Sequence, residues 1–131
     1  MRAVARRENG SLKHEIEIRQ HSVTADEAES TGGTDTGPNP QELLAASLAS
    51  CSAITMEMYA QRKGWEIGEV VVDVDYEPSQ RGSPTKFSMT VRLPKELPED
   101  QRERLMTIVA KCPVHRTLEG EVMFEERLEL A

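Results

Sequence analysis

The chain has two cysteines, which are its residues best suited to chemistry. Cys51 lies in the uncharged stretch LLAASLASCSAITM, and Cys112 opens the sequence CPVHR. A thiolate is a nucleophile and a metal ligand, and two thiols that meet can form a disulfide. The commonest fate of a single cysteine, however, is burial as an inert small side chain. Each cysteine can therefore be reactive or structural, and its surroundings must decide.

Cys51 is predicted to lie in the middle of a helix, about twelve residues from its start. The helix dipole favours an anion only within the first turn, so it gives a Cys51 thiolate little stabilisation. If Cys51 is reactive, a cation from elsewhere in the fold must lower its pKa. The structural alternative is that Cys51 packs like its small alanine neighbours.

Cys112 has a different setting, because Pro113 follows it and can begin a short helix. The backbone N–H groups of such a helix would favour a thiolate at its start. The structural alternative is a helix-end cysteine chosen for its size, but the titratable His115 and the charged Arg116 are unusual beside a core position.

A metal site is the other chemistry that these residues allow. Cys112 and His115 could hold zinc together with Cys51 and either His14 or His21. The chain has no CxxC or HxxxH spacing, so we predict no metal and no bound cofactor.

Composition excludes several classes of protein. A chain of 131 residues fits one domain, residues 1–131, with a single core. A net charge of −7 and only 4% aromatic residues argue against nucleic-acid binding. The N-terminus has no apolar signal region, and the longest uncharged run is too short to span a bilayer. We therefore predict a cytoplasmic protein with no membrane partner, where two cysteines are more often catalytic or inert than a structural disulfide.

The N-terminal third reads as strands and a loop. Residues 2–7 and 12–19 flank Asn9-Gly10, which predicts a hairpin with a two-residue turn. Residues 21–26 can form a third short strand. Residues 26–38, rich in glycine, threonine and acids, predict a loop.

The helix that carries Cys51 is the best-marked element. Asn39 suits its N-cap, Pro40 its first position and Glu42 a capping box, and Gly64 follows its end near Lys63. A helix that is apolar all round must be buried on all sides. A chain this short offers little second layer, which suggests that a partner subunit covers part of the helix.

After the long helix, the sequence predicts a hairpin, a second helix and a final strand. Residues 69–78 and 85–94 alternate in polarity and predict a second hairpin. Residues 97–112 predict a helix that ends before Pro113, and a turn or short helix begins there. Residues 121–130 alternate and predict a final strand. The fold class is therefore α+β.

The sequence resembles the OsmC/Ohr superfamily of thiol-dependent organic hydroperoxide reductases, and its OsmC-like branch most closely. The resemblance rests on GPNPQELLAASLASCSAIT, KGWEIGEVVVDVDYEP and KCPVHRTLEG, and it covers nearly the whole chain from Arg19. It implies an intertwined α+β homodimer, in which two long central helices are wrapped by antiparallel sheets.

The resemblance also implies a two-cysteine peroxidase that acts in oxidative-stress defence. Cys51 matches the peroxidatic cysteine, whose thiolate would attack the O–O bond of an organic hydroperoxide and leave a sulfenic acid and an alcohol. Cys112 matches the resolving cysteine, which would close a Cys51–Cys112 disulfide. An external dithiol reductant, of the lipoyl or thioredoxin type, would restore both thiols.

The family's peroxidases also support the thiolate with an arginine and a glutamate. Arg7 is the best positional match for the arginine, followed by Arg6 and Arg19. The acid follows the NP pair directly in the best-studied branch, where this chain has Gln41, and Glu42 comes one residue later. Glu42 can therefore be catalytic or only a capping residue.

Helix geometry places such a pair across a subunit interface. Glu42 and Cys51 are nine residues apart on one helix, which is about 13.5 Å along its axis. They cannot touch within one chain, so Glu42 and Arg7 would support the partner's thiolate. The alternative to a peroxidase is a non-catalytic dimer that binds a small apolar ligand in a pocket lined by the cysteines.

Overall fold

A computed structural model describes residues 1–7 and 9–131. The chain forms two compact units, Met1–Ala46 and Ser47–Ala131. Three strands form one antiparallel sheet, two strands form another, and three α-helices accompany them. The predicted α+β class is confirmed.

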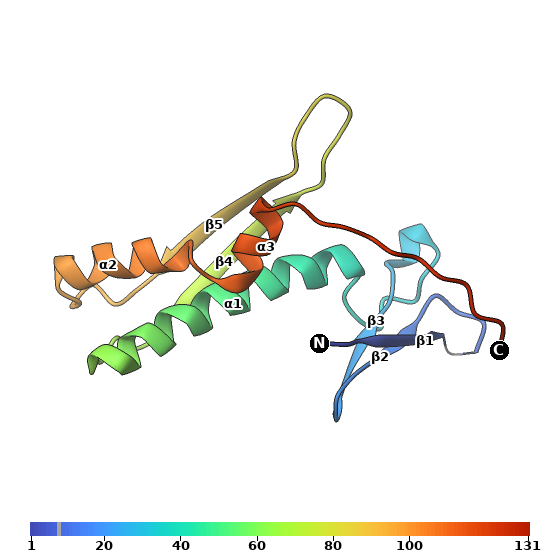
Figure 1. Cartoon of the computed structure of the whole chain (residues 1–131), viewed down its shortest axis with the longest axis horizontal. Coiled ribbons are helices and arrows are strands. Elements are labelled where there is room, and N and C mark those ends of the chain that lie inside the picture. Colours follow the sequence, from blue (N-terminus) through green and yellow to red (C-terminus); the bar gives the residue numbers. More distant parts are fainter. Residues whose placement is uncertain (8) are drawn as a thin grey trace. The chain divides into compact units, whose positions relative to one another are not determined.

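The first unit is built on a three-stranded antiparallel sheet in the order β1-β2-β3 (Figure 1). The strands are β1 (Val4–Arg7), β2 (His14–Ile18) and β3 (His21–Ala25), so the predicted hairpin and third strand are confirmed. One apolar face of the sheet lines a cavity of about 470 Å³, with Leu12, His14 and Ile16 in its wall. Within the first unit, this face of the sheet is therefore only partly covered.

The connection between β1 and β2 is wider than predicted. Asn9 and Gly10 both have positive φ, at 43° and 74°, as the hairpin signal requires. The strands nevertheless end at Arg7 and restart at His14, so the two-residue turn is wrong. The Arg7 guanidinium donates to the carbonyl oxygens of Gly10 at 2.6 Å and Ser11 at 2.8 Å. These hydrogen bonds stabilise the longer loop.

The loop after β3, which contains the short 3-10 helix η1 (Glu29–Thr31), is organised around one buried carboxylate. Asp26 is 2% exposed and accepts hydrogen bonds from the hydroxyls of Thr34 at 2.8 Å and Thr36 at 2.7 Å, and from the backbone N–H of Glu27 at 2.8 Å. These donors hold the pKa of Asp26 well below its usual range, with the Thr36 hydroxyl as the main cause. Gly33 lets the loop close, because a Cβ there would lie 2.0 Å from the Glu27 carbonyl oxygen.

We expect Asp26→Ala to lower the melting temperature by roughly 5–10 °C at neutral pH, because five hydrogen-bond donors lose their acceptor. A carboxylate with a depressed pKa stabilises the fold fully above its usual pKa, near 3.9, and loses this contribution as the pH falls below that value. Thermal unfolding of wild type and variant across pH checks this. The melting temperatures of wild type and Asp26→Ala should converge at acidic pH. Glu29→Ala, a control on the exposed part of the same loop, should have the melting temperature of wild type at every pH.

The long helix α1 (Pro40–Lys63) has the ends that the sequence predicts. The Asn39 backbone N–H donates to Glu42 Oε1 at 2.9 Å, and the Glu42 N–H donates to Asn39 Oδ1 at 2.8 Å. This reciprocal pair is the predicted capping box. Gly64 has a φ of 69°, which ends the helix.

The second unit packs most of α1 and two further helices with a β-hairpin. The hairpin consists of β4 (Val71–Glu77) and β5 (Lys86–Arg92), and α2 (Glu99–Val109) and α3 (Pro113–Glu119) follow it. Figure 1 shows the three helices grouped beside this hairpin. Residues from α1, α2 and the connections between elements form the buried core, which comprises Met56, Ala60, Ile67, Leu97, Leu105 and Val109.

One face of α1 is partly exposed among the residues that the structure describes. Its buried positions are Leu48, Ser52, Met56 and Ala60, a single stripe at helical spacing. Ile54 and Met58 remain 55% and 53% exposed. The helix is long and apolar enough to cross a membrane, a test that the core helix of a globular protein also passes, and 22% of its most apolar window is buried. The other face of α1 is free to pack against a further apolar surface.

The predicted final strand at residues 121–130 is wrong for the single chain. The segment after α3 runs as an extended chain without secondary structure (Figure 1). Its apolar side chains are exposed, including Phe124 at 78% and Leu130 at 91%. A strand needs a sheet edge to satisfy its backbone hydrogen bonds, and the chain pairs these residues with none of its own described strands.

Candidate functional site

Cys112 occupies the N-cap of α3, as the sequence predicted for a short helix that begins at Pro113. Its side chain is fully buried, with 0% exposure. The backbone N–H of His115 donates to Cys112 Sγ at 3.2 Å, and the Ser52 hydroxyl donates to the same atom at 3.7 Å. Two donors from different helices therefore point at this sulfur, and both would stabilise it as a thiolate.

Cys51 projects from α1 toward the same helix start. It is half-buried and lies within hydrogen-bonding reach of the Cys112 side chain, the Val114 backbone N–H and the Thr55 side chain. Both thiols are free, so the two sulfur atoms meet without a bond between them. The fold thus places two thiols about sixty residues apart in sequence at the N-terminus of one short helix.

The immediate surroundings of Cys51 oppose ionisation on balance. Burial raises the pKa of the Cys51 thiol, and contact with Cys112 raises it further, whereas the Val114 N–H and the Thr55 side chain act in the opposite direction. No cation is among these causes.

His115 extends the site on the side of α3. Its Nδ1 atom lies 2.9 Å from Glu119 Oε1, one helical turn away, but it is shielded from solvent and makes no well-aligned hydrogen bond. Arg116, on the same helix, is exposed.

The predicted supporting residues have other partners. Arg7 donates to the carbonyl oxygens of Gly10 and Ser11, and Glu42 forms the capping box with Asn39. The alternative arginines are also engaged, Arg6 with Glu17 at 3.4 Å and Arg19 with Gln20 at 3.4 Å. The structural role predicted for Glu42 is confirmed, and the catalytic roles of Glu42 and Arg7 stay predictions.

Comparison with known proteins identifies the family. The model of the OsmC family, described as OsmC-like protein, matches residues 33–127, which is more than half of the chain. The chain belongs to the OsmC-like family.

Individual relatives of this OsmC-like protein are distant. An uncharacterised protein of Haloferax volcanii is 28% identical over 90 residues, which is 67% of this chain and 68% of that protein. An OsmC-like protein of Mycoplasma pneumoniae has a similar structure, with a TM-score of 0.76 and 22% identity over 91% of this chain and 86% of that chain. The organic hydroperoxide resistance protein OhrB of Bacillus subtilis matches at a TM-score of 0.61 and 23% identity, over 91% and 90% of the two chains. At these identities the solved structures establish the fold.

Sequence reasoning missed two side chains of the OsmC-like site. Ser52 directly follows Cys51 in α1 and donates to Cys112, and Thr55 lies one helical turn beyond Cys51 and touches its thiol. The i, i+4 spacing of Cys51 and Thr55 could have identified the second contact. The Ser52 contact depends on how α3 packs against α1, which the sequence does not show.

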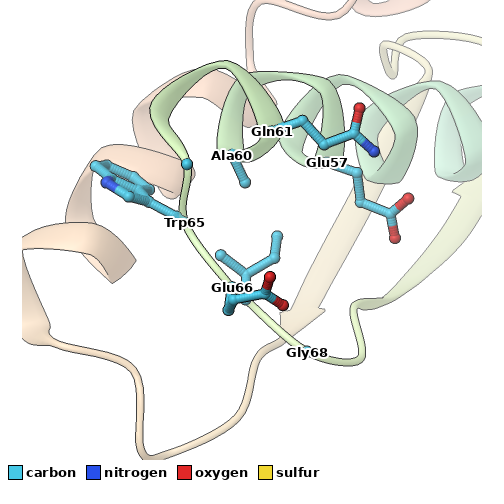
Figure 2. A pocket seen from close by; sticks show the side chains of 8 residues that line it. Glu57, Ala60, Gln61, Trp65, Glu66 and Gly68 are labelled. Carbon is cyan, nitrogen blue, oxygen red and sulfur yellow. The ribbon is translucent and has the colours of Figure 1, made fainter.

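A separate pocket lies at the C-terminal end of α1, and no cysteine lines it. It measures about 480 Å³ and is lined by Glu57, Ala60, Gln61 and the segment 64–68. Figure 2 shows the carboxyl groups of Glu57 and Glu66 on the same side of the loop, with Trp65 directed away from them. The apolar cavity of the first unit likewise has no cysteine in its lining. Among the residues that the structure describes, no group of three histidine, cysteine or acidic side chains could hold a metal.

Proposed function

We propose that this OsmC-like protein is a two-cysteine thiol peroxidase that reduces organic hydroperoxides to alcohols. The observation that carries the proposal is the interaction of Cys51 with Cys112 at the start of α3, where the His115 N–H donates to Cys112 Sγ and the Val114 N–H lowers the pKa of Cys51. The family supports it, because several solved neighbours of this fold are described as organic hydroperoxide resistance proteins.

The first step is attack by the Cys51 thiolate on the O–O bond of the hydroperoxide. An S–O bond forms as the O–O bond breaks, and the departing alkoxide takes up a proton to become the alcohol. The Val114 N–H, which lies at the Cys51 sulfur, stabilises the attacking thiolate. Cys51 is the better candidate for this step because it is half-buried, whereas Cys112 is fully buried.

The second step is closure of a disulfide. The Cys112 thiolate attacks the Cys51 sulfenic acid, and the hydroxyl group leaves as water after protonation. The donors from His115 and Ser52 stabilise the Cys112 thiolate for this attack. An external dithiol then returns both cysteines to thiols and becomes a disulfide itself, so the protein needs no bound cofactor.

Activation of Cys51 requires a homodimer in this proposal. Burial raises the pKa of the Cys51 thiol, and none of the main influences on that pKa is a cation. The exposed face of α1 with Ile54 and Met58, the partly covered sheet and the exposed tail with Phe124 are surfaces that a second copy would bury. Arg7 and Glu42 of the partner subunit would then approach the thiol. We place the protein in the cytoplasm, where a reducing compartment keeps such thiols ready.

The decisive experiment counts free thiols and measures intact mass before and after one equivalent of cumene hydroperoxide. We expect rapid loss of two thiols and a decrease of about 2 Da, because disulfide formation removes two hydrogens. Persistence of both thiols through excess peroxide would refute the peroxidase and favour the dimer that binds a small apolar ligand.

Replacing Cys112 by serine separates the two steps. We expect Cys112→Ser to consume one equivalent of hydroperoxide at the wild-type rate and then to stop as a sulfenic acid, with a mass increase of about 16 Da. Trapping with dimedone and mass spectrometry checks this. A wild-type disulfide-forming cycle in the variant would contradict the role of Cys112.

A further inference from the structure

A group of cations surrounds one tyrosine beside the thiol site. Arg104 Nε of α2 donates to the Tyr59 hydroxyl at 2.8 Å, and its guanidinium carbon lies 5.5 Å from the ring centroid. Lys63 Nζ, at the end of α1, lies 5.6 Å from the same centroid. Lys111, which follows α2, is close enough to act on the hydroxyl electrostatically. We call Lys63, Arg104 and Lys111 the basic cluster.

The basic cluster is unusual for this chain, which has 23 acidic and 16 basic residues. Across residues 1–7 and 9–131, none of the three cations forms an ion pair with a carboxylate. Lys63 and Lys111 lie near helix C-termini, where a cation is favoured. That preference does not explain why Lys63 and Arg104 both lie over the Tyr59 ring, with Lys111 near enough to act on its hydroxyl. The cluster has positive charge to offer to an external anion.

Position links the basic cluster to the thiols. Lys111 directly precedes Cys112, and Tyr59 lies eight residues after Cys51 on α1, which is about 12 Å along the helix. A protein partner covers about 800 Å² of a surface, a patch about 30 Å across. One docked protein can therefore contact the cluster and reach Cys51. All three cations are exposed, so they present a surface suited to a protein partner.

We propose that the basic cluster is the docking surface for an acidic protein that carries the reducing dithiol. The inference rests on the proposed peroxidase cycle, and it adds that the protein that supplies the dithiol is negatively charged. The donor thiolate attacks Cys51 Sγ, the more accessible sulfur, and Cys112 leaves as a thiolate held by the His115 N–H. The second donor thiolate then attacks the mixed disulfide and frees Cys51. The donor loses two electrons and two protons in total and becomes a disulfide.

The test compares protein donors with a small neutral one. The double variant Lys63→Gln/Lys111→Gln removes two cluster charges, and Arg81→Gln/Lys86→Gln removes two exposed charges from the β4–β5 hairpin as a matched control. Turnover of cumene hydroperoxide is measured with dithiothreitol, with reduced thioredoxin and with a dihydrolipoyl domain, the two proteins being chosen for net negative charge.

We expect the cluster variant to lose about tenfold in kcat/KM for the preferred acidic protein at low ionic strength. The loss should shrink in high salt, because screening weakens contacts between exposed charges. Dithiothreitol turnover, and the control variant with every donor, should match wild type. The docking proposal would be overturned if the cluster and control variants had equal kcat/KM with the protein donors. It would also be overturned if wild type turned over with dithiothreitol but with neither protein donor. Both results would leave the peroxidase proposal standing. Absence of turnover with dithiothreitol would refute the peroxidase and the docking proposal together.

Discussion

Replacing Cys51 by serine is expected to abolish hydroperoxide reduction, with a fall in turnover of about 10³-fold or more, because the attacking atom is removed. The substitution is nearly isosteric, and Cys51 is only half-buried, so the fold should be retained. Coupled consumption of cumene hydroperoxide with dithiothreitol measures the loss. Circular dichroism and thermal unfolding establish that the variant is folded.

The matched control for this prediction is Ser50→Ala, which alters the neighbouring exposed residue of the same helix. It should keep turnover within about twofold of wild type, because the Ser50 side chain is exposed and its hydroxyl donates to the Ser47 carbonyl oxygen. Residual activity above a tenth of wild type in Cys51→Ser would show that Cys51 is not the peroxidatic cysteine.

The second large effect is expected at the uncovered face of α1. Met58 is 53% exposed, and we expect Met58→Glu to weaken the proposed homodimer by about 10³-fold, because a two-fold interface there would bury two unpaired carboxylates. Analytical ultracentrifugation over a range of concentrations measures this. Met106→Glu is the matched control, since Met106 on α2 is 48% exposed and carries the same change of charge.

Dissociation should also change the chemistry of Cys51. Within one chain, burial raises the pKa of the Cys51 thiol. A raised pKa leaves less thiolate at neutral pH, so the Met58→Glu monomer should react slowly with iodoacetamide at neutral pH and faster only in alkaline buffer. If wild type forms the proposed homodimer and a partner cation reaches Cys51, wild type should react at lower pH. Identical pH profiles for monomer and dimer would show that no partner residue activates Cys51.

Local sequence determined the ends of most elements. Asn39 and Glu42 specify the start of α1 because their side chains satisfy helix N–H groups next to them in sequence. Pro113 similarly makes Cys112 an N-cap. Such signals act over three or four residues and can be read directly. The resemblance to the OsmC-like family, which rests on the motifs around both cysteines, then predicted a peroxidatic role for Cys51 and a resolving role for Cys112.

Tertiary structure decided what surrounds those cysteines. The donation from Ser52 to Cys112, the Val114 N–H at Cys51 and the raised Cys51 pKa all depend on how α3 packs on α1. Arg7 could be assigned to the thiolate from its position, but in the fold its guanidinium holds a wider loop. The alternating tail at residues 121–130 has strand character in sequence, yet it forms no strand in the chain. Pairing needs an edge from elsewhere, and a pattern within one segment cannot supply that partner.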